Sequence, residues 1–389
     1  MNILFVLKSL NIGGLEVVTA VLANKFVQEG HNVSVFAFET LSGKLIERFS
    51  EKIKYKIGYG FKNNKENIIA LRDIIIEENI HVIINQWGLP LIPINVIKSA
   101  KKGKNIKVIS VYHNDPLKNG RVQNVDKEIA LTKNIPKRIF LSFKRYCYRC
   151  ITGYSMRYIY YHSDVFEVLS PSYIEHFKRF TKLRNVKKLV VQTNPVTLSS
   201  EGYTYNHLLK KKEIVYVGRL DYTQKRVYRV IDTWGLIENQ FPDWSLRIIG
   251  DGAERENIYQ KAKDLGVKRI SFEGYQQPRP YYEHASILIL TSDYEGFPLV
   301  LAECMSFGVV PVVYGSYPAV YDIIEDGKDG AIIEKNSNGF NAAVMAERLA
   351  CLMRDDIIRN KMALSAISKS RVFSIENIYR QWVSILEKS

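Results

Sequence analysis

The sequence alternates short β-branched runs with amphipathic helical stretches along most of its length, and this alternation limits the possible folds most strongly. It is typical of a parallel sheet whose strands are joined by helices. In the first half, strands are predicted at 3–7, 33–38, 82–86, 107–112 and 166–170. In the second half, strands are predicted at 213–218, 246–250, 270–274, 286–291 and 309–314. The sequence therefore predicts an α/β protein built from two similar doubly wound units.

The length and the connecting segment agree with two domains. At roughly 150 residues per domain, 389 residues suffice for two. Residues 192–206 lie between the two series of strands and form a polar stretch with a proline and no periodic pattern. Such a stretch is typical of a domain junction.

The composition excludes several classes of protein. Hydrophobic residues make up 46% and charged residues 24% of the chain, which argues against wholesale disorder. No apolar run reaches the ~18–20 residues that span a bilayer. The first residues, MNILFVL, favour a strand over a signal peptide, so we expect a cytoplasmic protein. Four scattered cysteines do not indicate a disulfide framework, and Cys147-x-x-Cys150 is interpreted as ordinary helix packing.

The net positive charge of the chain lies in its first half. Residues 1–195 hold 31 Lys and Arg against 15 Asp and Glu, whereas residues 196–389 hold 24 against 25. Residues 101–195 alone hold 20 against 6. An anionic surface, either a membrane or a nucleic acid, is therefore expected to face this half, with simple solubility as the alternative. Because no nucleic-acid recognition motif is present, we expect no nucleic-acid partner.

Residues 137–162 predict an amphipathic helix within this basic region. A projection at ~100° per residue places Arg138, Arg145 and Arg149 opposite an aromatic stripe. The stripe comprises Phe140, Phe143, Cys147, Ile151, Tyr154, Tyr158 and Tyr161. Such a helix could lie on an anionic membrane or present its arginines to a lipid diphosphate. In the alternative interpretation the stripe is core and the arginines are solvated. The local charge excess favours a peripheral position on the inner face of the cell membrane.

Several well-known ligand motifs are absent from the sequence. Neither half carries G-x-G-x-x-G after its first strand, and there is no G-x-x-x-x-G-K-[ST] phosphate loop. There is also no Asp-x-Asp motif and no cluster of His and Cys at zinc spacing. We therefore expect neither a cofactor nor a bound metal. Two α/β units that face each other still form a cleft, because open sheets bind ligands beyond the carboxyl ends of their strands.

The segment 291–313 carries the most specific chemistry. A predicted strand is followed by Glu295, by Gly-Phe-Pro, and by a helix that contains Glu303. The start of such a helix is an anion site, because its N–H groups and its positive dipole end point outward. Two carboxylates beside a phosphate site suit a nucleotide sugar. The alternative is a capped helix with two solvated glutamates.

This segment, EGFPLVLAE, resembles the paired-glutamate signature of the retaining glycosyltransferases of family 4, which have the GT-B fold. Four more motifs occur in the family's order, namely NIGGLEVV (11–18), YVGRLDYTQKR (216–226), IIGDGAER (248–255) and FEGYQQP (272–278). The resemblance spans nearly the whole chain. It implies two Rossmann-like domains whose parallel sheets face a deep cleft.

The resemblance also implies how the domains divide the work. Residues 1–195 would bind the acceptor and the membrane, and residues 196–373 would bind the nucleotide sugar. Asn194–Pro195 resembles the family's hinge. The last helix, 374–389, would pack back on the first domain, with Trp382 as its anchor.

Individual roles follow from the same resemblance. Arg219 and Lys225 would contact the donor diphosphate, for which a guanidinium fork and an ammonium are suited. Arg226 remains an alternative to Lys225. Glu295 would contact the hydroxyls of the sugar, and Glu303 would contact the ribose.

Further donor-site residues are implied more weakly. They are Gly13, Gly14, Gly296, Phe297, Pro298, Leu299 and Tyr275, the last of which would stack on the base. His113, at the end of a predicted strand, would reach the transferred sugar, unless it is a structural histidine. Asp115 is interpreted as a turn residue before Pro116.

The implied reaction is the transfer of a hexosyl unit from a nucleoside diphosphate sugar, with UDP-sugars favoured, and with retention of configuration. The acceptor would be a lipid-linked or polysaccharide hydroxyl in a bacterium. Two alternatives remain. A sugar-nucleotide epimerase of similar fold would need no acceptor, and a non-catalytic membrane or glycan-binding module would not turn over a donor.

Overall fold

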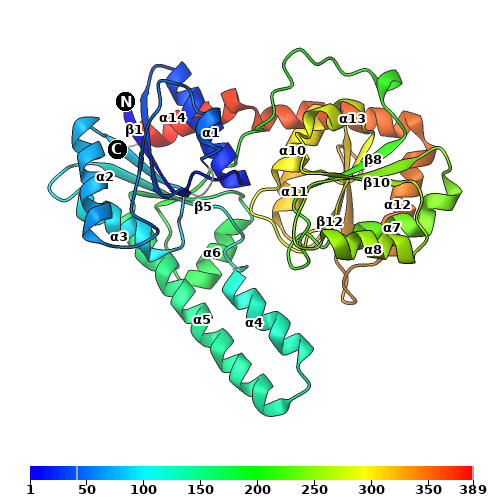
Figure 1. The fold of residues 1–389 in the computed structure, drawn as a ribbon, viewed down its shortest axis with the longest axis horizontal. Coiled ribbons are helices and arrows are strands. Elements are labelled where there is room, and N and C mark those ends of the chain that lie inside the picture. Colours follow the sequence, from blue (N-terminus) through cyan, green and yellow to red (C-terminus); the bar gives the residue numbers. More distant parts are fainter. Residues whose placement is uncertain (41–42, 119, 388–389) are drawn as a thin grey trace. The chain divides into compact units, whose positions relative to one another are not determined.

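The computed structural model describes residues 1–40, 43–118 and 120–387, without the side chain of Arg121. The chain divides into two compact units, which are Met1–Pro195 together with Ile375–Ser389, and Val196–Ser374. Each unit contains a parallel sheet with helices packed against it (Figure 1). The α/β fold predicted from the alternation of strands and helices is confirmed.

The first unit contains a seven-stranded sheet with the order β3-β2-β1-β4-β5-β6-β7. Its strands are β1 (Asn2–Ser9), β2 (Asn32–Glu39), β3 (Lys54–Ile57), β4 (Val82–Asn85), β5 (Lys107–Tyr112), β6 (Val165–Val168) and β7 (Leu189–Val191). All of the pairings are parallel. The order reverses between β1 and β4, and ligands of open sheets bind at such a switch point.

Seven helices of this unit are described. They are α1 (Gly14–Gln28), α2 (Lys65–Glu77), α3 (Leu91–Ala100), α4 (Gly120–Leu131), α5 (Ile135–His162), α6 (Tyr173–Thr181) and α14 (Ile375–Glu387). A short 3-10 turn, η1, covers Ile46–Arg48. The ring of Phe26 on α1 lies 6.1 Å from Phe5 of β1 and 6.2 Å from Trp382 of α14. The buried Trp382 thus anchors the last helix on the core of the first unit.

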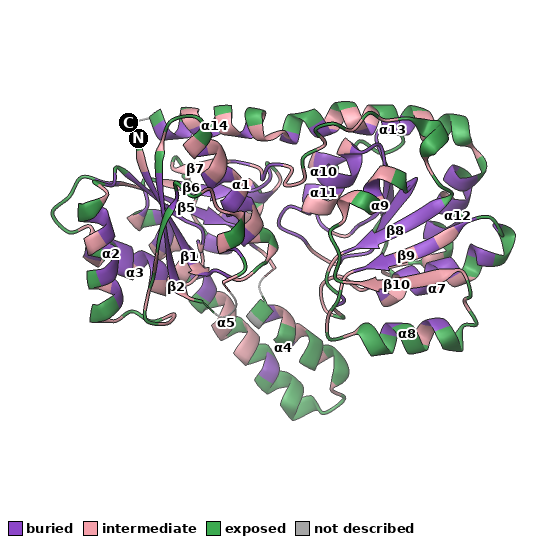
Figure 2. Ribbon diagram, turned by 45° about the horizontal axis from the view of Figure 1, so that its top comes forward, coloured by how far each residue is buried: buried purple, intermediate pink, exposed green. Residues whose placement is uncertain are grey.

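Helices α4 and α5 form a pair that extends from the first unit (Figure 1) and is largely exposed (Figure 2). The inner face of α5 buries Leu141, Thr152, Gly153, Met156, Ile159 and Tyr160. The interpretation of the aromatic stripe as core is wrong, because Phe140, Phe143, Ile151, Tyr154 and Tyr161 are all exposed. The helix reaches the sheet through its other face instead, where Tyr160 packs 6.3 Å from Phe166 of β6.

The second unit contains a six-stranded parallel sheet with the order β10-β9-β8-β11-β12-β13. Its strands are β8 (Glu213–Val217), β9 (Ser245–Ile249), β10 (Ile270–Gly274), β11 (Ile287–Leu290), β12 (Val310–Gly315) and β13 (Ala331–Glu334). The order reverses between β8 and β11. The carboxyl ends of these two central strands therefore flank the switch point of the second sheet.

The helices around this sheet follow its strands in sequence. They are α7 (Tyr228–Ile237), α8 (Arg255–Asp264), α9 (Arg279–His284), α10 (Leu299–Ser306), α11 (Ala319–Ile323), α12 (Ala342–Arg354) and α13 (Asp356–Ser370). Short 3-10 turns occur at η2 (His207–Leu209), η3 (Glu238–Gln240) and η4 (Arg371–Phe373). The core includes Trp234 of α7 and Trp244 beside β9, each almost completely buried.

Candidate active site

The candidate site of the second unit lies where the loops after β8 and β11 meet. Arg219 and Lys225 lie in the first loop, and Glu295 lies in the second. The ammonium of Lys225 donates a hydrogen bond of 2.6 Å to Oε1 of Glu295, and the two side chains are only 14% and 7% exposed. The structure thus brings together two residues that are 70 positions apart in the sequence.

Gln224 extends this ion pair into a network. Its amide nitrogen donates to Oε2 of Glu295 at 3.2 Å, and its amide oxygen accepts from the guanidinium of Arg219 at 3.1 Å. Arg219 itself is exposed. The buried carboxylate of Glu295 therefore holds the ammonium of Lys225. The guanidinium of Arg219 lies nearby and has donors that face solvent.

Arg226, the alternative to Lys225, has a different partner. Its Nε donates to Asp293 at 2.6 Å, and Asp293 also accepts from Arg229 at 2.6 Å. The backbone of Arg226 is left-handed, with φ of 54°. The guanidinium of Arg226 is thus committed to Asp293, whereas Lys225 is paired with Glu295.

The residues after Glu295 begin helix α10. The side chain of Phe297 is buried and lies 5.3 Å from the ring of Phe373, so only its main chain can face a ligand. Pro298 caps the helix, and Leu299 is its first residue. The first N–H groups of a helix have no partner within it, and they favour an anion together with the helix dipole.

Glu303 lies on α10 and is almost fully buried. The hydroxyl of Thr197 donates a short hydrogen bond to its carboxylate. Burial raises the pKa of Glu303 to about 7, and the hydrogen bond from Thr197 acts in the opposite direction. Glu303 therefore changes its charge near neutral pH.

The neighbouring loops are packed backbone against backbone. A Cβ atom on Gly250 would lie 1.9 Å from the carbonyl oxygen of Gly218, and Gly250 has φ of 143°. Glycine is therefore required where the loop after β9 approaches the loop after β8. Tyr275, which follows β10, is 63% exposed and makes no ring contact with a described residue.

In the first unit, Gly13 and Gly14 lie between β1 and α1. A Cβ atom on Gly13 would lie 2.5 Å from a carboxylate oxygen of Glu16. Glu16 is buried at the start of α1, and this burial raises its pKa. The Gly-Gly-x-Glu segment thus lies at the switch point, with the carboxylate of Glu16 close to the backbone of Gly13.

His113 follows β5 and is partly buried. Its Nε2 donates to Oε1 of Gln86 at 2.5 Å, and burial lowers the pKa of the imidazole to about 3. His113 is therefore neutral at physiological pH. It can offer a hydrogen-bond partner to a ligand, but it does not supply positive charge.

The three arginines of α5 lie in different surroundings. Arg145 forms an ion pair of 2.5 Å with Asp126 of α4, and the guanidinium of Arg149 lies 5.6 Å from the ring of Phe180. Arg138 is exposed. Two of the three thus contact neighbouring helices of the first unit.

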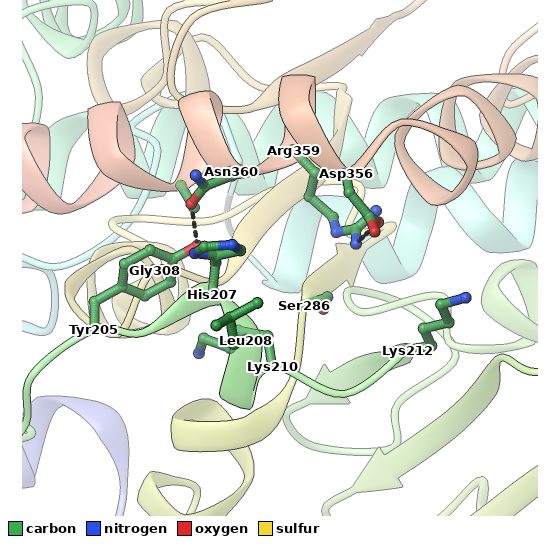
Figure 3. A pocket seen from close by; sticks show the side chains of 11 residues that line it. Tyr205, His207, Leu208, Lys210, Lys212, Ser286, Gly308, Asp356, Arg359 and Asn360 are labelled. Carbon is green, nitrogen blue, oxygen red and sulfur yellow. Dashed lines mark hydrogen bonds and ion pairs between the residues drawn. The ribbon is translucent and has the colours of Figure 1, made fainter.

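A pocket of about 200 Å³ lies at the opposite, amino-terminal edge of the second sheet. Its lining includes Lys210 before β8, Ser286 before β11 and Gly308 before β12. Figure 3 shows two interacting pairs among its lining residues, Tyr205 with Asn360 and Arg359 with Asp356. Because it lies at the opposite edge of the sheet from Lys225 and Glu295, this pocket is separate from the candidate site.

Sequence reasoning missed several residues of these networks. Gln224 and Thr197 contact Glu295 and Glu303 across 71 and 106 positions, a separation that no local pattern reveals. Asp115 is a turn residue, as predicted, and its Oδ1 accepts a hydrogen bond of 2.8 Å from the backbone N–H of Leu117, but the sequence did not reveal its second partner. Its side chain is buried and accepts a hydrogen bond of 2.7 Å from His176.

The described part of the chain contains neither a metal-binding cluster nor a helix that could span a membrane. Within residues 1–40, 43–118 and 120–387, no three His, Cys, Asp or Glu side chains gather so that they could hold a metal ion. None of the helices in this part of the chain is both long and apolar enough to span a membrane.

Each of the two units matches one described family model. Residues 12–199 match "Glycosyltransferase Family 4", and residues 204–369 match "Glycosyl transferases group 1". An α-1,4-N-acetyl-D-galactosaminyltransferase of Campylobacter jejuni, named for a GalNAc-containing glycan on diphosphate-linked undecaprenol, is 26% identical over 99% of this chain and 98% of its own. A lipopolysaccharide 1,6-galactosyltransferase of Salmonella typhimurium is 30% identical over 38% of this chain and 42% of its own.

Solved structures show the same fold. HepE of Anabaena, in complex with UDP and glucose, aligns with a TM-score of 0.74 at 16% identity over 99% of both chains. TarM of Staphylococcus aureus aligns with a TM-score of 0.72 at 14% identity, over 100% of this chain and 99% of its own. The fold, the two family matches and the full-length relative agree with the motifs. The chain is a hexosyltransferase of the GT-B fold that is similar to the family 4 glycosyltransferases.

Proposed function

We propose that this protein transfers a hexosyl unit from a UDP-sugar to a hydroxyl of a lipid-linked or polysaccharide glycan, with retention of configuration. The observation that supports this proposal most directly is the buried pair of Lys225 and Glu295 with Arg219 beside it. Cations, a buried carboxylate and the start of α10 occur together at the switch point of a parallel sheet. This combination suits a sugar diphosphate.

The second unit would bind the donor. Arg219, Lys225 and the main chain of Gly296, Phe297, Pro298 and Leu299 would hold the diphosphate, and Glu295 would accept hydrogen bonds from the sugar. Glu303 would bind the ribose and Tyr275 the base. Gly13, Gly14 and the neutral His113 of the first unit would complete the contacts to the donor.

In the proposed reaction, the acceptor hydroxyl attacks the anomeric carbon from the face of the sugar on which the diphosphate leaves. The bond between the anomeric carbon and the diphosphate oxygen breaks, and a bond to the acceptor oxygen forms. The proton of the acceptor hydroxyl passes to the leaving diphosphate. The fixed charges of Lys225 and Arg219 stabilise the negative charge that develops there, which is a preorganised electrostatic contribution.

The first unit would bind the acceptor and a membrane surface. Its basic charge and the relative's diphosphate-linked undecaprenol glycan support an acceptor that carries a polyprenyl diphosphate. The exposed α4–α5 pair, with Arg138, Arg145 and Arg149, would contact anionic lipid. This gives a peripheral location on the inner face of a bacterial cell membrane.

The proposal can be tested with a panel of UDP-sugars. Binding of each donor is measured by calorimetry, and transfer is measured on an undecaprenyl-diphosphate-linked glycan that ends in N-acetylgalactosamine. We expect one UDP-sugar to bind and to give a product whose new bond has the donor's anomeric configuration by NMR. An inverted bond would disprove retention, and conversion of the donor to an isomer without acceptor would favour the epimerase alternative.

Treatment with a chelator is expected to leave transfer unchanged within twofold. Lys225 and Arg219 would supply the positive charge that a divalent ion supplies in other glycosyltransferases. The initial rate is measured with and without EDTA, and a metal-dependent glycosyltransferase serves as the positive control. A loss of activity that Mg²⁺ or Mn²⁺ restores would contradict this role for the two side chains.

Replacement of Arg138, Arg145 and Arg149 by glutamine is expected to weaken binding to anionic liposomes about tenfold or more. A cation near an anionic membrane contributes about 1 kcal/mol, and Asp126 already offsets part of the charge of Arg145. Binding is measured by co-sedimentation, with zwitterionic liposomes as the reference. Replacement of Arg247, Arg255 and Arg348 in the second unit provides the matched control, and an equal loss in both variants would contradict a specific role for α5.

A further inference from the structure

A buried carboxylate in the first unit orients a histidine that the proposed reaction does not use. Oδ1 of Asp115 accepts hydrogen bonds from Nδ1 of His176 at 2.7 Å and from the backbone N–H of Leu117 at 2.8 Å. The side chain of Asp115 is 2% exposed, whereas that of His176 is 26% exposed. The pair therefore joins an enclosed anion to an imidazole that solvent can reach.

The pair lies at the ligand-binding edge of the first sheet. Asp115 comes three residues after β5, and His176 lies on α6, the helix that follows β6. Strands β5 and β6 are parallel neighbours, with Val111 opposite Glu167. Their carboxyl ends therefore meet at one edge, the same edge at which β1 and β4 form the switch point.

The hydrogen bond to Asp115 fixes what His176 can offer. A carboxylate that accepts from Nδ1–H holds the neutral imidazole in the tautomer whose Nε2 carries a lone pair, as in other carboxylate–histidine pairs. Nε2 of His176 makes no hydrogen bond to any residue that the structure describes. His176 thus presents an oriented hydrogen-bond acceptor.

Other polar atoms at this edge have no partner. Within the described chain, Nε2 of Gln86, Nε1 of Trp87 and Oε1 of Gln192 are buried without a hydrogen bond. Gln86 and Trp87 directly follow β4, and Gln192 directly follows β7. Buried polar atoms are normally satisfied, and these three belong to residues at the carboxyl ends of β4 and β7, the edge of the sheet at which His176 also lies.

The chemistry of these atoms favours hydroxyl groups over an anion. Gln86 and Trp87 offer donors, whereas Gln192 and His176 offer acceptors, and none of the four atoms belongs to a lysine or an arginine. A hydroxyl both donates and accepts, so a sugar can satisfy a mixed set of this kind. A diphosphate only accepts, and it would leave Gln192 without a partner.

We propose that Nε2 of His176 accepts a hydrogen bond from a hydroxyl of the acceptor sugar, and that Asp115 acts as a positioning residue by orienting the imidazole. This inference rests on the proposed glycosyltransfer and adds a specific contact with the acceptor glycan. It assigns no proton transfer to His176, because the leaving diphosphate takes the proton.

The test uses His176→Asn in the full-length protein. The amide nitrogen of asparagine can occupy the place of Nδ1 and keep the hydrogen bond to Asp115, while the acceptor at Nε2 is lost. With the lipid-linked glycan described above, we expect the KM for the acceptor to rise about tenfold at nearly constant kcat. The donor Kd and the slow hydrolysis of the UDP-sugar without acceptor stay within twofold of the wild type.

Asp115→Ala is expected to reproduce this defect, because Nδ1–H of His176 then loses its acceptor and the imidazole is no longer oriented. The double variant adds little to either single change, since both act on one hydrogen bond. His162→Asn is the matched control. His162 lies at the end of α5, at the amino edge of the sheet, and its Nδ1 pairs with the carbonyl oxygen of Tyr158 at 2.8 Å. This control keeps the wild-type KM for the acceptor.

Three results would overturn the proposal: an unchanged KM for the acceptor in His176→Asn, equal losses of transfer and of donor hydrolysis, or additive effects in the double variant. Each of them leaves the proposed glycosyltransfer intact, because the wild type remains active. A wild type that neither hydrolyses nor transfers any UDP-sugar would instead disprove the proposed function itself.

Discussion

Glu295→Gln is expected to lower kcat/KM for transfer by about 100- to 1,000-fold, the usual cost of removing one preorganised partner of the transition state. The change is isosteric, but it removes the charge that holds Lys225 at 2.6 Å and weakens the acceptor for the hydroxyls of the sugar. Lys225→Met is expected to cause a loss of the same order. The measurement is the initial rate of transfer at several donor concentrations.

The chain offers a matched control two residues away. The side chain of Asp293 forms ion pairs with Arg226 and Arg229, and not with Lys225. Asp293→Asn and Arg226→Met should lower the melting temperature while transfer at a permissive temperature falls less than tenfold. If the variants at Asp293 and Glu295 lose equal activity, the pair of Lys225 and Glu295 has no special role in donor chemistry.

The affinity for the donor is expected to fall about tenfold for each pH unit below pH 7. Burial raises the pKa of Glu303 to about 7, and only its ionised form accepts hydrogen bonds from both ribose hydroxyls. Above pH 7 the Kd for a UDP-sugar should reach a plateau. The diphosphate diester of such a donor does not titrate in this range, so calorimetry from about pH 5 to pH 9 isolates the protein group.

Variants of the same contact provide the controls. Glu303→Gln should bind the UDP-sugar more weakly than the wild type. Its Kd should not begin to rise as the pH falls below 7. Thr197→Val should move the midpoint to higher pH, because the lost hydroxyl stabilised the carboxylate. A flat profile in the wild type would remove Glu303 from the donor contacts.

Protonation of Glu303 should weaken donor binding but should stabilise the unbound protein against unfolding. A carboxyl group whose pKa is raised in the folded state binds its proton more tightly there than in the unfolded chain. Its contribution to the free energy of unfolding is therefore greatest below its ordinary pKa of 4.5 and is lost as the pH rises towards 7. Protonation of Glu303 does not unfold the protein at low pH. Unfolding caused by this group therefore cannot explain weaker donor binding there.

The sequence predicted the central strands and the GT-B fold, because buried parallel strands are continuous apolar runs and the five motifs follow them. The strands it missed are short. They are β3, β7 and β13, which have only three or four residues. Strand β3 reads Lys-Tyr-Lys-Ile and lies at the edge of its sheet, where a strand needs only one apolar face and little length.

Helix α5 shows a second limit of sequence reasoning. The projection identified an aromatic stripe and an arginine face, but it could not decide which face meets the protein. That choice depends on Phe166 of β6, against which Tyr160 packs, and on Asp126 of α4, which holds Arg145. Contacts between distant segments also fix Thr197 beside Glu303 and His176 beside Asp115. They arise only when the chain has folded.

The return of α14 to the first unit affects the order in which the protein is completed during synthesis. The ring of Phe26 on α1 packs against Tyr379 and Trp382, which the ribosome adds only after the whole of 196–374. The second unit is continuous in the nascent chain, so it can fold while α1 still exposes this apolar surface. The half of the enzyme that is translated first is therefore the half that is finished last.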